Sequence, residues 1–143
     1  MKLYQEDHPG PGTPLLLIAG LASDAISYTF QIEPLNQQHR LLLCDNRGVG
    51  RSPKPPGPYT IAQMSDDILE FLPDQRVHIL GHSMGGAIAQ HLAAHHPEKV
   101  DKLILACTQQ SFHGRTLAIV ESWAALLKLQ PDAALLGRSL FPW

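Results

Sequence analysis

A serine between two glycines, placed where an apolar run gives way to a helical pattern, constrains this chain more than any other feature. Residues 81–86 read Gly-His-Ser-Met-Gly-Gly and follow the mainly apolar run of residues 77–80. In this context the motif G-x-S-x-G predicts a sharp strand-to-helix turn that pushes the Ser83 hydroxyl out of a sheet. We expect Gly81 and Gly85 where a side chain would collide across the turn, and the last glycine where the helix approaches the strand. The helix N-terminus at Ser83 would stabilise an oxyanion through its partial positive charge.

Apolar runs alternate with helical patterns along the rest of the chain. Strands are expected at residues 2–6, 15–19, 40–44, 77–80 and 100–107, and helices at 27–37, 61–72 and 84–96. Strands that alternate with helices predict an α/β fold with a mostly parallel sheet and flanking helices. After Thr108 the pattern is helical, at residues 117–129 and again from Pro131, and it contains no strand signal.

The composition indicates which kinds of binding partner and which cellular compartment are expected for this protein. Hydrophobic residues make up 44% of the 143 residues, and the net charge is −2, so nothing favours a nucleic acid or an anionic membrane as a partner. Cys44 and Cys107 each end an apolar run, which predicts two buried thiols rather than a disulfide and favours a reducing compartment. The first residues carry no apolar signal region, and the early apolar run is too short to span a bilayer. We therefore expect a cytoplasmic protein.

Three motifs in order resemble the α/β-hydrolase family. They are Leu-Ile-Ala-Gly-Leu at residues 17–21, Asp-x-Arg-Gly-x-Gly-x-Ser at residues 45–52, and the serine turn at residues 81–86. The match is nearest to small serine esterases and lactonases with a helical cap. The resemblance implies that residues 1–108 are the N-terminal part of an α/β-hydrolase core and residues 109–143 the beginning of a cap. It also implies truncation after the family's sixth strand and the start of the cap.

The resemblance assigns roles to a few residues. Ser83 matches the nucleophile, and the backbone N–H groups of Met84 and Leu21 match the oxyanion hole. Ala19 stands where the family usually has a histidine, although the donor in this loop is a main-chain group. The loop of Asp45 and Arg47 is structural in the family, so these two residues are expected to form an ion pair or loop clamp. The implied substrate is a small carboxylic ester, lactone or thioester, and no metal or organic cofactor is implied.

No complete catalytic triad can be assigned. The family order is serine, then acid, then histidine, with the last two on loops after later strands. The acids after Ser83 are Glu98, Asp101, Glu121 and Asp132, and the histidines are His91, His95, His96 and His113. None follows a seventh or eighth strand, and His82 adjoins Ser83 on a turn where neighbouring side chains point apart. Catalysis is therefore expected to need a missing C-terminal part.

Functions other than that of a serine hydrolase are also open to this chain. The chain can be a non-catalytic fragment or half of a split hydrolase that binds its missing C-terminal half or itself, through the uncovered edge of its last strand. A nucleotide-binding domain would need G-x-G-x-x-G or G-x-x-x-x-G-K-[ST], and neither occurs. His91 and His95 have the spacing of two metal ligands, but the glutamate of the metalloprotease motif and a third ligand are missing, which favours an exposed helix surface.

Overall fold

A computed structural model describes residues 1–111 and 114–129, which fall into two units. The first unit comprises residues 1–110, and the second begins at Ser111. In the second unit the structure describes the helix α4 (Arg115–Lys128), which Gly114 precedes with a φ of 58°. The second helical pattern expected there, from Pro131, lies outside the described residues. The assignment of this unit to a cap stays a prediction.

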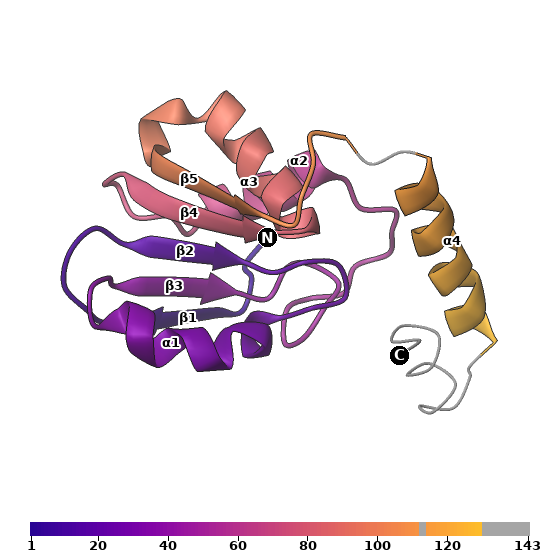
Figure 1. The fold of residues 1–143 in the computed structure, drawn as a ribbon, viewed down its shortest axis with the longest axis horizontal. Coiled ribbons are helices and arrows are strands. Elements are labelled where there is room, and N and C mark those ends of the chain that lie inside the picture. The colour runs from indigo at the N-terminus through magenta and orange to yellow at the C-terminus, as the bar shows by residue number, and fades with distance from the viewer. Residues whose placement is uncertain (112–113, 130–143) are drawn as a thin grey trace. The chain divides into compact units, whose positions relative to one another are not determined.

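The first unit is built on a five-stranded sheet in the order β1-β3-β2-β4-β5 (Figure 1). The strands are β1 (Gln5–His8), β2 (Leu15–Ile18), β3 (Leu41–Cys44), β4 (Val77–His82) and β5 (Val100–Ala106). Strand β1 is antiparallel to β3, and all other pairs are parallel. This confirms the predicted mostly parallel α/β sheet. β2 and β3 consist entirely of buried apolar residues, as expected for parallel strands covered on both faces.

Helices connect the parallel strands. They are η1 (Ala25–Tyr28), α1 (Thr29–Asn36), α2 (Ile61–Leu69), α3 (Met84–His95) and η2 (Pro97–Lys99). The N-terminus of α2 is fixed by a capping box, in which Thr60 accepts from the Gln63 N–H and the Gln63 side chain accepts from the Thr60 N–H. None of the helices in the described ranges is both long and apolar enough to cross a membrane.

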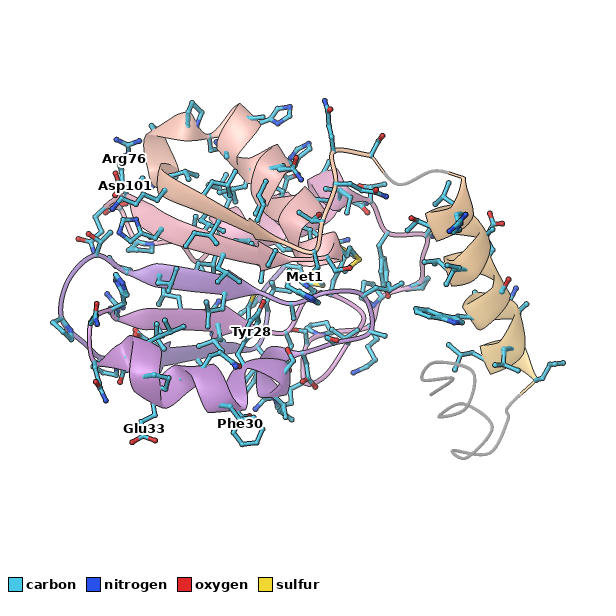
Figure 2. The ribbon with its side chains drawn as sticks, viewed as in Figure 1. Met1, Tyr28, Phe30, Glu33, Arg76 and Asp101 are labelled. Carbon is cyan, nitrogen blue, oxygen red and sulfur yellow. The ribbon has the colours of Figure 1, made fainter. Side chains whose placement is uncertain are left out.

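Alternate residues along the strands belong to two separate hydrophobic cores. Leu16, Ile18 and Ile79 belong to one core, which Ile88 and Leu92 of α3 complete. The intervening strand residues face the other core, which Tyr28, Ile32 and Leu35 from η1 and α1 complete. In Figure 2 the Tyr28 side chain points toward the sheet, whereas Phe30 and Glu33 point away from it. The helices that follow the neighbouring strands β2 and β4 thus pack on opposite faces of the sheet, and open α/β sheets bind ligands at the carboxyl ends of such strands.

The sequence located every strand, but several boundaries were wrong. The first strand begins three residues later than expected, at Gln5, and α2 ends at Leu69 rather than at residue 72. The helix expected at 27–37 is a 3₁₀ turn followed by α1, because Asp24 caps the chain earlier by accepting from the Ile26 N–H. Cys44 is buried as predicted, whereas Cys107 is exposed, since it lies in the turn after β5 with a φ of 52°.

Strand β5 differs from the other parallel strands in its exposure. It pairs with β4 on one side and is the last strand in the order, so its other edge is unpaired within the described sheet. Its apolar residues Leu103, Ile104 and Leu105 are 37%, 47% and 44% exposed. They belong to both faces of the strand, so both faces lack the cover that β2 and β3 have.

Candidate active site

Ser83 occupies a strained turn between β4 and α3. β4 ends at His82 and α3 begins at Met84, which leaves Ser83 alone between them with φ 53° and ψ −120°. A positive φ is uncommon for a residue with a side chain and costs free energy of order 1–3 kcal/mol. The surrounding structure must enforce this conformation.

Two glycines allow the turn to close. A Cβ on Gly81 would lie 2.5 Å from the Gly85 carbonyl oxygen and 2.6 Å from the Gly86 Cα. A Cβ on Gly85 would collide with the Ile18 carbonyl oxygen and lie 2.6 Å from that of Ala19. Both obstacles are main-chain atoms that cannot move aside. The collision at Gly81 lies across the turn, as predicted, whereas that at Gly85 is with the end of β2.

Gly86 lies close to two neighbouring segments, the strand before the turn and the chain after β5. A Cβ on Gly86 would lie 2.5 to 2.7 Å from the side-chain atoms of Thr108, which follows β5. Gly86 therefore makes room for the chain beyond β5, and its Cα also lies close to β4, 2.6 Å from the position of a Cβ on Gly81, as expected. Hydrogen bonds fasten the same region, because the Ser83 N–H donates to the Ala106 carbonyl at 2.9 Å and the Gly86 N–H to the Ser83 carbonyl at 2.9 Å.

The loop of residues 20–24 lies against this turn. A Cβ on Gly20 would be 3.2 Å from the Ser83 Cβ, so the two backbones are close neighbours. Pairing of Ile18 with Gly81 in the sheet causes this, since the segments after these residues leave adjacent strand ends. Among the described residues, neither the Leu21 N–H nor the Met84 N–H donates to a protein acceptor. Both N–H groups are therefore available to an acceptor outside the described protein.

Asp45 and Arg47 do not pair with each other, contrary to one of the two roles expected for them. Asp45 is buried and accepts from the Arg51 Nε at 3.0 Å. Arg47 instead donates to both carboxylate oxygens of Asp67 on α2, at 2.6 and 2.8 Å. Positive φ angles at the two glycines of this loop turn the chain back, so that Arg51 rather than Arg47 reaches Asp45.

The contacts of Asp45 and Arg47 shift the pKa values of both side chains toward their charged forms. Burial acts to raise the pKa of Asp45, but hydrogen bonds from the Arg51 side chain and from the Arg51 and Ala25 N–H groups outweigh it and leave the pKa below its ordinary value. The hydrogen bonds to Asp67 raise the pKa of Arg47 against the opposing effect of burial. Both groups therefore stay charged at neutral pH.

The histidines form no site with Ser83 in the described structure. His91 and His95 stack with ring centroids 4.0 Å apart, and His82 is exposed beside the serine. No cluster of three or more metal-ligating side chains exists within residues 1–111 and 114–129. His113 and Asp132, which were considered for the triad, lie outside the described residues.

Sequence reasoning missed three residues that shape this region. Asn46 is buried, and its Nδ2 donates to the Ala19 carbonyl at 3.2 Å. Arg51 lies over the Tyr4 ring, 3.7 Å from its centroid, besides pairing with Asp45. The Tyr28 hydroxyl donates to the Ile18 carbonyl at 3.0 Å, and burial raises the pKa of Tyr28 to about 12. Asn46 and Arg51 both lie within the motif of residues 45–52, at positions that the motif leaves unspecified, and Tyr28 lies in no motif, so none of the three carried a signal of its own.

Comparison with known proteins places this architecture among hydrolases. The family described as alpha/beta hydrolase fold matches residues 13–136. A relative from Azorhizobium caulinodans, named as the carbamate hydrolase RutD, is 38% identical over 125 residues, which cover 85% of this chain and 42% of the relative. The chain thus spans less than half the length of that protein.

Two solved structures also match this chain over about half of their own length. A hydrolase from Pseudomonas aeruginosa superposes with a TM-score of 0.77 at 35% identity, covering 87% of this chain and 48% of that one. The enol-lactonase from Burkholderia xenovorans superposes with a TM-score of 0.76 at 28% identity, covering 95% and 55%. Each of the three is longer than the chain described here.

Proposed function

Because the chain belongs to the α/β-hydrolase fold family, we propose that the whole protein is a serine hydrolase whose nucleophile is Ser83. The observation that carries the proposal is the strained turn, which sets a serine at a helix N-terminus and against the loop of residues 20–24. Strain of this kind persists where the surroundings enforce it and is concentrated at functional sites.

The proposed chemistry is acyl transfer to water. The Ser83 Oγ attacks the substrate carbonyl carbon and gives its proton to a histidine, while the Leu21 and Met84 N–H groups bind the oxyanion. The tetrahedral intermediate collapses, the leaving group takes the proton from the histidine, and an acyl-serine remains. Water activated by the same histidine then attacks the acyl carbon, which releases the acid and restores Ser83. None of these steps needs a metal or an organic cofactor.

The proposed substrate is a small ester, lactone, thioester or carbamate. All four present a carbonyl with a leaving group, so they share the same tetrahedral intermediate. The carbamate comes from the name of the Azorhizobium relative and the lactone from that of the Burkholderia structure. The low cysteine count favours a reducing compartment, and a cytoplasmic location is part of the proposal.

The histidine and its acid are proposed to come from polypeptide outside the described residues. No histidine or carboxylate within residues 1–111 and 114–129 is hydrogen-bonded to the Ser83 hydroxyl. A serine without an adjacent base is a weak nucleophile. The 143-residue chain alone should therefore hydrolyse esters only weakly, through its oxyanion donors.

Labelling with a fluorophosphonate tests the nucleophile, because this reagent reacts with activated serines. In the whole protein the label should be found on Ser83 by mass spectrometry, and Ser83→Ala should abolish both labelling and hydrolysis of p-nitrophenyl butyrate. Ser23→Ala is the matched control, since Ser23 lies in the neighbouring loop and should be dispensable. Labelling that survives in Ser83→Ala, or no labelling of the whole protein, would contradict the proposal.

A further inference from the structure

The loop that carries Leu21 has little structure of its own. Its one internal main-chain hydrogen bond in the described structure joins the Ser23 N–H to the Gly20 carbonyl at 3.2 Å. Ala22 has a φ of 57°, which is costly for a residue with a side chain, and Leu21 is 49% exposed. An oxyanion donor must be held to within a fraction of an ångström, so something else must fix this loop.

Two consecutive residues after β3 hold the two ends of the loop. The Asn46 Nδ2 donates to the Ala19 carbonyl at 3.2 Å, and Asp45 Oδ1 accepts from the Ala25 N–H at 3.0 Å. Both contacts are buried, with Asp45 0% and Asn46 1% exposed. Buried hydrogen bonds to otherwise unpaired main-chain groups resist opening more than exposed ones.

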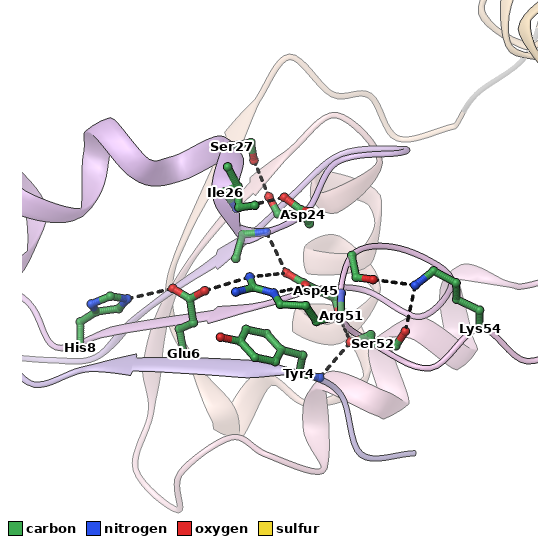
Figure 3. A network of polar contacts seen from close by, with 12 residues as sticks. Tyr4, Glu6, His8, Asp24, Ile26, Ser27, Asp45, Arg51, Ser52 and Lys54 are labelled. Atoms are coloured by element: carbon green, nitrogen blue, oxygen red, sulfur yellow. Dashed lines mark hydrogen bonds and ion pairs between the residues drawn. The ribbon is translucent and has the colours of Figure 1, made fainter. Parts of the chain in front are cut away.

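Asp45 is itself held from several sides (Figure 3). The Arg51 N–H donates to Asp45 Oδ2 at 2.8 Å, and the Ser52 hydroxyl donates to the Asp45 carbonyl at 2.5 Å. The Arg51 guanidinium continues to Glu6 of β1 at 2.9 Å. A Cβ on Gly50 would collide with the Asp45 carboxylate, so the glycine is needed for this approach. The residues that grip the loop are therefore fixed to the sheet.

We infer that Asn46 and Asp45 are positioning residues that place the Leu21 N–H for the oxyanion by clamping Ala19 and Ala25 on either side of it. This inference rests on the proposed function of Ser83. Asn46 Oδ1 has no hydrogen-bond partner among the described residues, so the clamping contact is the one bond that replacement of Asn46 removes. Loss of the clamp weakens binding of the transition state and leaves binding of the substrate nearly unchanged.

The test replaces Asn46 in the whole protein and uses Asn36 as a matched control. Asn36 Nδ2 also donates to main-chain carbonyls, those of His8, Pro9 and His39, but these lie at the opposite end of the strands. Asn46→Leu should lower kcat about 10- to 100-fold with KM changed less than about threefold. Affinity for a trifluoromethyl ketone, to whose carbonyl Ser83 adds to give a bound oxyanion, should fall by the same factor. Asn36→Leu should change neither.

The outcomes separate the clamp from simple destabilisation and from the proposed function. Equal losses in Asn46→Leu and Asn36→Leu, or unchanged kcat and ketone affinity in a folded Asn46→Leu, overturn the inference. Hydrolysis that survives in Ser83→Ala overturns the proposed function instead. If Asn46→Leu does not fold, the inference is tested by NMR on the wild-type protein. Binding of the ketone should then shift the signals of the Asn46 side-chain amide together with that of the Leu21 N–H. A Leu21 shift without an Asn46 shift would overturn the clamp.

Discussion

Replacement of Gly86 by alanine tests how tightly the serine turn is packed against the chain after β5. An alanine Cβ at this position would lie 2.5 Å from Thr108 Cγ2, 2.6 Å from its Cβ and 2.7 Å from its Oγ1. Threonine is β-branched and stiff, so it cannot turn all three atoms away. Crowding of this kind costs about 1–3 kcal/mol. Alanine also favours the helix by about 1 kcal/mol over glycine, so the net loss of unfolding free energy should be about 0–2 kcal/mol.

The change that Gly86→Ala causes in the free energy of unfolding should reverse its sign when Thr108 is replaced by glycine. In a Thr108→Gly background the obstacle is gone, and Gly86→Ala should stabilise the protein by up to about 1 kcal/mol. The Thr108 hydroxyl is buried without a partner among the described residues, so its removal leaves no new unpaired group in this part of the structure. Ala94→Gly, at an exposed position of the same helix, calibrates the helix preference and should cost about 1 kcal/mol.

Urea unfolding followed by circular dichroism measures these differences. Fluorescence is a poor reporter, because Trp123 and Trp143 both lie beyond residue 110, outside the unit that contains the turn. With an m-value of about 2 kcal/mol per molar urea, a loss of 2 kcal/mol lowers the midpoint by about 1 M. The reasoning is refuted if Gly86→Ala stabilises the protein with Thr108 present, or if the double-mutant cycle gives a coupling below about 0.5 kcal/mol.

Four further outcomes are expected. The 143-residue chain alone should hydrolyse p-nitrophenyl acetate far more slowly than ordinary esterases, and fast turnover that Ser83→Ala abolishes would show that a histidine of this chain completes the site. Light scattering should detect self-association through β5 as concentration rises, whereas a monomer at millimolar concentration with slow amide exchange along residues 103–106 would contradict it. A thiol reagent should modify exposed Cys107 and spare Cys44, whose pKa burial raises to about 12, and mass spectrometry of the peptides decides this. The pKa of Asp45 lies below its ordinary 3.8, so its stabilising contribution is complete above that pH and lost as the pH falls through the lowered value; Asp45→Asn should weaken this acid dependence in urea titrations.

Local patterns predicted the strands and the serine turn, because each depends on adjacent residues. The buried strands are uninterrupted apolar runs, and the turn needs glycines at fixed offsets from Ser83. The ion pairs could not be predicted in this way. Arg47 and Arg51 are both near Asp45 in sequence, and which one reaches it depends on the path that Gly48 and Gly50 give the loop.

The part played by Asn46 had no local signal either. Its contact with Ala19 joins residues 27 positions apart that meet only because β2 and β3 are neighbours in the sheet. The roles of Ser83, Leu21 and Met84 stay predictions. Labelling of Ser83 and the kinetics of the variants decide them.

The strand order also determines when the site can form as the chain is synthesised. The pairing that brings the loop of residues 20–24 to the serine turn joins β2 to β4, and Leu15 pairs with His78, about sixty positions later. The Ser83 N–H needs the Ala106 carbonyl, which leaves the ribosome later still. Until then β1, β3 and β2 can pair, with the wholly apolar β2 as a bare edge. A growing chain of this protein therefore passes through a stage at which a chaperone has an apolar strand to bind.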